Sequence, residues 1–120
     1  TLYDRVFEGI DRTKANVRVL GFSQGADTAC RWIDRGRVRA EHLVLWAGLC
    51  PPDVDLTRRN TPFGSMKISI VVGSSDALAT PERVAGLEAR LAGRDYDLVR
   101  FDGGHHLDRN VLLKLAEVPV

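Results

Sequence analysis

The chain lacks the features that mark several classes of protein. Only 2 of its 120 residues are cysteines, Cys30 and Cys50, and no C-x-x-C spacing joins them. They are interpreted as free thiols, small and buried, in a reducing compartment, so a cytoplasmic location is expected. No apolar run reaches the roughly 18 residues of a membrane helix, and no secretory signal pattern opens the sequence. We therefore expect neither a membrane span nor secretion.

An excess of charge of one sign is also absent. The chain has 17 basic and 16 acidic residues, a net charge of +1, so no basic field favours nucleic-acid binding. Its hydrophobic content of 44% is ordinary for a soluble protein and sufficient for a core. The length fits one domain over residues 1–120.

Segments with strand character alternate with segments of helical periodicity. Strands rich in Val, Ile and Leu are expected over residues 17–20, 41–48, 66–72 and 96–101, and helices over residues 2–12, 26–35, 81–91 and 108–117. Buried apolar strands separated by helices indicate a parallel sheet with both faces covered. The predicted fold class is α/β, a three-layer, mostly parallel sheet flanked by helices.

A serine stands on a tight turn between the first of these strands and the helix after it. The turn reads Gly21-Phe22-Ser23-Gln24-Gly25, the G-x-S-x-G pattern of a nucleophile elbow. Such a turn strains the serine backbone and exposes its hydroxyl above the sheet. Gly21 and Gly25 are expected where a side chain would strike neighbouring backbone. The alternative is an ordinary glycine-rich turn.

Two further polar residues follow strands in the same way. Asp76 lies shortly after the strand over 66–72, and His105 shortly after the strand over 96–101. Because ligands bind beyond the carboxyl ends of parallel strands, Ser23, Asp76 and His105 are expected at one rim of the sheet. A serine needs a histidine base, and a carboxylate can orient that histidine. The order Ser, Asp, His is typical of α/β-hydrolases.

Alternatives exist for two of these residues. Asp76 could merely cap a turn, and His106 is the rival base, although the Gly-Gly-His context favours His105. A metal site built from His105, His106 and Asp108 is a weaker alternative, because the spacing matches no familiar ligand pattern. No metal is expected.

Other residues at the same rim are candidates for substrate binding. Trp46, Leu49 and Leu78 are expected to shape an acyl pocket, although core packing explains Trp46 equally well. His42 opens a strand and is interpreted as a surface residue.

Three motifs together resemble one family. They are the segment Gly21-Phe22-Ser23-Gln24-Gly25-Ala26, the segment Val71-Val72-Gly73-Ser74-Ser75-Asp76, and Gly103-Gly104-His105. In order and spacing they resemble the phospholipase/carboxylesterase group of the α/β-hydrolase superfamily, which includes acyl-protein-thioesterase-like and bacterial carboxylesterases. The resemblance implies Ser23 as nucleophile, Asp76 as orienting acid, His105 as base and the backbone N–H of Gln24 as an oxyanion-hole donor. It implies no metal or organic cofactor.

The resemblance covers only the carboxyl-terminal half of that fold. The second oxyanion donor of the family comes from a loop after an early strand, and residues 1–16 contain no counterpart. The strand over 17–20, with Val17 and Leu20 at its ends, would then have a bare edge. Since such an edge invites pairing with another chain, a homodimer or a complex across it is expected.

The sequence therefore predicts a serine hydrolase that cleaves small-molecule carboxylic esters or thioesters through an acyl-enzyme on Ser23. The alternative is a non-catalytic or latent half-domain, which acts as an assembly subunit or needs a missing half for activity.

Overall fold

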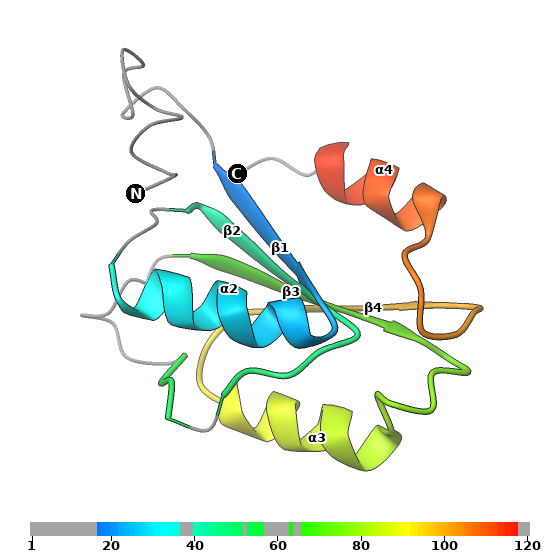
Figure 1. The fold of residues 1–120 in the computed structure, drawn as a ribbon, viewed down its shortest axis with the longest axis horizontal. Helices are drawn as coiled ribbons and strands as arrows, with labels where there is room; N and C mark the ends of the chain where they lie inside the picture. Colours follow the sequence, from blue (N-terminus) through cyan, green and yellow to red (C-terminus); the bar gives the residue numbers. More distant parts are fainter. Residues whose placement is uncertain (1–16, 37–39, 52, 57–62, 64–65, 118–120) are drawn as a thin grey trace.

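The computed structural model describes residues 17–36, 40–51, 53–56, 63 and 66–117. The helix expected over residues 2–12 lies outside them. The described helices and strands are β1 (Arg18–Phe22), α2 (Gln24–Asp34), β2 (His42–Trp46), β3 (Lys67–Gly73), α3 (Pro81–Arg90), β4 (Asp97–Phe101) and α4 (Arg109–Glu117) (Figure 1).

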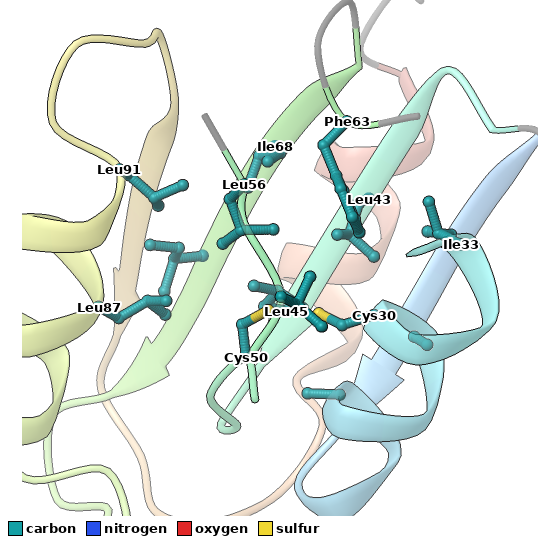
Figure 2. Close-up of a cluster of buried hydrophobic side chains, with 14 of the residues drawn as sticks. Cys30, Ile33, Leu43, Leu45, Cys50, Leu56, Phe63, Ile68, Leu87 and Leu91 are labelled. Carbon is teal, nitrogen blue, oxygen red and sulfur yellow. The ribbon is translucent and has the colours of Figure 1, made fainter. Parts of the chain in front are cut away.

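The strands form a parallel sheet in the order β1-β2-β3-β4. Helices α2 and α3 cover one face, where they enclose the larger core, and α4 packs on the other face (Figure 1). Figure 2 shows the larger core, in which Leu43 and Leu45 of β2 lie between Ile33 of α2 and Leu87 of α3. The predicted α/β class and parallel sheet are confirmed.

The interior strands are apolar because both of their faces are covered. All five residues of β2 are buried, and only Lys67 of β3 is not. The outer strands β1 and β4 are exposed over part of their length. This contrast explains why the interior strands are nearly continuous runs of Val, Ile and Leu.

Helices α3 and α4 begin where the sequence predicts, and α2 begins at Gln24, two residues before the predicted start. The Thr80 hydroxyl accepts a hydrogen bond from the N–H of Arg83 at 3.3 Å, and Pro81 occupies the first turn, where no N–H is needed. The carboxylate of Asp108 likewise accepts from the N–H of Val111 at 3.0 Å. Among the described helices, none has both the length and the hydropathy of a membrane span.

Two arginines near the end of α3 bind described residues of the long segment between β2 and β3. Arg90 donates to the carbonyls of Cys50 and Val54 at 2.6 and 2.7 Å, and Arg94 donates to the carbonyls of Leu56 and Phe63 at 2.7 and 2.6 Å. Burial lowers the pKa of the Arg94 guanidinium. The composition of this segment predicts only a loop. The arginines that bind the carbonyls of Val54 and Phe63 lie about 30 to 40 residues further along the chain.

The expectation that His42 lies at the surface is wrong. Its side chain is fully buried, and its Nε2 lies 2.8 Å from the hydroxyl oxygen of Ser69. The reason is its place in the sheet, because β1 and β3 flank His42 at Arg18 and Lys67. Burial, with the charges of Lys67 and Arg18 as smaller causes, lowers the pKa of His42.

We expect His42 to make the fold sensitive to mild acid. Because the pKa of His42 is lower in the folded protein, the unfolded chain takes up the proton first as the pH falls. Stability is retained above the unfolded-state pKa, near 6.5, and lost below it, by about 1.4 kcal/mol per pKa unit of depression. Urea unfolding at pH near 7.5 and near 5.5 should show this loss in the wild type and a smaller one in His42→Gln. Equal losses in both proteins would exclude His42 as the cause.

Candidate active site

Ser23 occupies the strained turn that the sequence predicts. It caps α2 directly after β1, with φ 56° and ψ −121°. Apart from Ala47, it is the only described non-glycine residue with a positive φ. A side chain in this region costs conformational energy, so the surrounding structure must hold the turn in place.

Close backbone contacts hold the Ser23 turn. The N–H of Ser23 donates to the carbonyl of Trp46 at 2.8 Å, so the turn is hydrogen-bonded to the end of β2. A Cβ at Gly21 would lie 2.6 Å from the Cα of Ala26, and a Cβ at Gly48 would lie 2.3 Å from the carbonyl oxygen of Ser23. Both positions therefore require glycine.

The structure confirms the expected constraint at Gly21 and contradicts it at Gly25. A Cβ at Gly25 would meet no atom within 4 Å, because this residue already lies on the exposed side of the first turn of α2. The second constrained glycine is Gly48. It follows β2, and no local pattern places it against the turn at Ser23.

Ser23, His105 and Asp76 form one chain of hydrogen bonds. The Nε2 of His105 lies 2.9 Å from the Oγ of Ser23, and its Nδ1 lies 2.8 Å from the Oδ2 of Asp76. The three residues follow β1, β4 and β3, whose carboxyl ends lie at one edge of the sheet. The arrangement could carry a proton from a serine hydroxyl to an imidazole whose orientation a carboxylate fixes.

Asp76 is held as an ionised hydrogen-bond acceptor. Its side chain is 0% exposed, and its second oxygen, Oδ1, accepts from the N–H groups of Leu78 and Ala79 at 2.8 and 3.3 Å. Burial raises the pKa of Asp76, but the hydrogen bonds from His105 and from these N–H groups lower it further than burial raises it. Asp76 therefore caps its own turn and also binds His105. The two alternatives for Asp76, a turn cap and a partner of the histidine, both hold.

Residues that the sequence did not single out surround His105. The ring of Phe22 packs against the imidazole with 5.1 Å between ring centroids. The loop that carries His105 crosses directly over Gly73, where a Cβ would lie 2.4 Å from the carbonyl oxygen of Gly104. Because side chains alternate along a strand, Phe22 lies on the other face of β1 from Gly21. This alternation could have identified Phe22 as a neighbour of His105.

The rival base His106 faces away from Ser23. Its side chain is exposed, its Nδ1 lies 3.0 Å from the carbonyl oxygen of Leu107, and its ring packs on Phe101. Within the part of the chain that the structure describes, no cluster of three His, Cys, Asp or Glu side chains could hold a metal ion. The structure therefore brings only His105 to Ser23.

The three residues expected to line an acyl pocket differ in position. Trp46 is fully buried, packs on Phe101 and donates its indole N–H to the carbonyl of His106 at 3.0 Å. The structure therefore favours the alternative of core packing for Trp46, because its side chain has no exposed surface that a substrate could contact. Leu49 lines a cavity of about 450 Å³ between α2 and α3, and Leu78 is 58% exposed.

Gln24, the residue expected to supply an oxyanion-hole donor, is the first residue of α2. Its side chain is exposed. The first N–H groups of a helix have no partner within the helix, so the N–H of Gln24 is of the type that binds a developing negative charge.

Solved structures of several esterases share this fold. A carboxylesterase from Mesorhizobium loti aligns with a TM-score of 0.67 and 22% identity, over 98% of this chain and 57% of its own. Acyl-protein thioesterase 2 of Zea mays aligns with a TM-score of 0.67 and 15% identity, over 91% of this chain and 57% of its own. The Bacillus cereus carboxylesterase aligns with a TM-score of 0.64 and 20% identity, over 96% of this chain and 54% of its own. These likenesses show an α/β-hydrolase fold, and the chain spans little more than half the length of these proteins.

Sequence comparison identifies the family. No curated protein sequence gives a significant match. The model of the family described as serine hydrolase (FSH1), however, matches residues 3–110, which include Ser23, Asp76 and His105. The chain therefore belongs to the FSH1 family of serine hydrolases.

Proposed function

We propose that this serine hydrolase cleaves small-molecule carboxylic esters or thioesters through an acyl-enzyme on Ser23. The observation that carries the proposal is the hydrogen-bonded chain from the Oγ of Ser23 through His105 to Asp76, with distances of 2.9 and 2.8 Å. The structural neighbours named as carboxylesterases and as an acyl-protein thioesterase support the ester and thioester class.

In the proposed mechanism His105 moves the proton and Ser23 forms the bond. The Nε2 of His105 takes the hydroxyl proton as the Oγ of Ser23 attacks the carbonyl carbon of the substrate. Asp76 keeps the other imidazole proton on Nδ1 and stabilises the positive charge that forms. His105 then protonates the departing alcohol or thiol, and water releases the acyl group by the same proton transfers in reverse.

The start of α2 is proposed to stabilise the oxyanion of the tetrahedral intermediate. The N–H of Gln24 and the positive end of the helix lie next to the nucleophile, where negative charge develops. One such donor is typically worth about 10²–10³ in rate. Nothing in this step requires a metal or an organic cofactor.

A fluorophosphonate probe should label Ser23 in the folded wild-type chain, because the probe reacts with a serine that a histidine activates. Intact-mass analysis should show one adduct, and Ser23→Ala should abolish it. Ser69→Ala is the matched control, because Ser69 also contacts a histidine but is only 1% exposed. This control should label like the wild type. Folded wild-type protein that takes up no probe would contradict the proposed nucleophile.

Replacement of Asp76 by Asn should lower kcat by up to about 10⁴ with little change in fold, because an amide does not stabilise the imidazolium and favours the wrong tautomer. Hydrolysis of p-nitrophenyl esters from acetate to octanoate measures the effect and ranks the acyl chains. Asp102→Asn is the control, since Asp102 is exposed and contacts Ser74 rather than His105. An unchanged kcat in Asp76→Asn would remove this carboxylate from the mechanism.

The outer edge of β1 favours a second role, as a latent half-domain that assembles with another chain. Among the described strands, none pairs with the side of β1 away from β2, and Leu20 on this strand is 40% exposed. Since a free apolar edge favours strand pairing, we propose that this protein forms a homodimer or a complex through the edge near Val17 and Leu20. Such a partner could also contribute a second oxyanion donor.

Sedimentation at micromolar concentration should then show a species larger than the monomer. Leu20→Lys should shift it toward the monomer, because a lysine on an edge strand opposes pairing. Leu113→Lys is the matched control, since Leu113 is 53% exposed but lies on α4 rather than on the edge of the sheet. A compact wild-type monomer would contradict assembly through this edge.

A further inference from the structure

Cys30 and Cys50 are the two nucleophilic side chains that the proposed hydrolysis does not use. Cys30 lies on α2 and is 0% exposed, and Cys50 lies in the segment after β2 and is 3% exposed. Both are free thiols within the larger core. Figure 2 shows their sulfur atoms directed toward one another from these two elements.

The two thiols interact directly. A hydrogen bond between them raises the pKa of Cys30 and lowers that of Cys50. Burial acts to raise the pKa of Cys50. The positive charge of Arg90 and a hydrogen bond from Arg90 act to lower that pKa. The Arg90 guanidinium, which donates to the carbonyl of Cys50 at 2.6 Å, places a positive charge beside Cys50, and a neighbouring cation favours the thiolate.

The surroundings of Cys50 favour a small polar reactant. Cys50 lines the cavity of about 450 Å³ between α2 and α3, whose charged lining residues are Arg31, Arg83, Arg90 and Asp27. The backbone at Cys50 is fixed in this position, because Arg90 donates to its carbonyl at 2.6 Å and to that of Pro51 at 2.7 Å. The cavity is lined by Cys50, which is 3% exposed, and not by Cys30, which is 0% exposed, so a small molecule reaches the Cys50 end of the pair first.

We propose that Cys50 and Cys30 form a peroxide-sensitive dithiol, in which Cys50 reacts first and Cys30 closes an intramolecular disulfide. The reduced pair is the resting state, in keeping with the cytoplasmic location that the sequence predicts. The oxidised pair joins α2 to the segment after β2, which also carries Gly48 against the carbonyl oxygen of Ser23.

The chemistry balances with hydrogen peroxide as the oxidant. The Cys50 thiolate attacks one peroxide oxygen, the O–O bond breaks, and the departing hydroxide takes up the thiol proton to leave as water. Cys30 then attacks the sulfur of the Cys50 sulfenic acid, the S–O bond breaks, and hydroxide leaves with the Cys30 proton as a second water. The two thiols lose two electrons, which reduce the peroxide, and dithiothreitol reverses the change.

Peptide mapping of the full chain tests the proposal. After treatment of the folded, reduced protein with hydrogen peroxide, the intact mass should fall by about 2 Da, and the Cys30 and Cys50 peptides should run as one species until dithiothreitol is added. Free thiols that persist after treatment of the folded protein, or a disulfide found only between two chains, would overturn the proposal.

Two variants test the order of the steps. In Cys30→Ala, Cys50 should stop at the sulfenic acid and be trapped by dimedone, because no second thiol can displace the hydroxide. In Cys50→Ala, Cys30 should stay reduced, since the core encloses it. Oxidation of Cys30 as fast as in the wild type would overturn the order. Circular dichroism checks the fold, and the serine versions of both variants replace any alanine variant that does not fold.

Discussion

The left-handed backbone at Ser23 is the constraint on which the site depends. A non-glycine residue in this conformation costs about 1–3 kcal/mol, and the turn persists only because its neighbours leave no room for another. The bond from the Ser23 N–H to the carbonyl of Trp46 and the close approach of Gly21 and Gly48 supply that restraint. The hydroxyl is consequently raised from the sheet toward His105 before any substrate is bound.

The parallel sheet brings residues that are distant in the sequence together at the site. Ser23 and His105 are 82 residues apart in the sequence, and His105 and Asp76 are 29 apart. Each follows a strand of the same direction, so the parallel strands β1, β3 and β4 bring all three to the edge of the sheet where the strands end. The loop that carries His105 then reaches its place because Gly73 lets its backbone cross directly over β3.

The sequence predicted the parts that depend on local pattern. It identified the strands, the Thr80 cap, the strained turn and the meeting of Ser23, Asp76 and His105, because each follows from periodicity or from the common direction of the strands. Contacts between residues of distant segments could not be predicted from the sequence. The buried His42 depends on which strands flank β2, and the contact at Gly48 depends on two chain segments that meet only in the folded protein.

The hydrogen bond between Trp46 and the loop after β4 depends on the side chain of only one partner. The indole N–H binds the main-chain carbonyl of residue 106, which every amino acid possesses, rather than the imidazole of His106. This hydrogen bond therefore does not depend on the side chain at position 106, although the packing of the His106 ring on Phe101 does. The hydrogen bond does depend on the tryptophan at position 46, because no other side chain offers an N–H on a ring of that size.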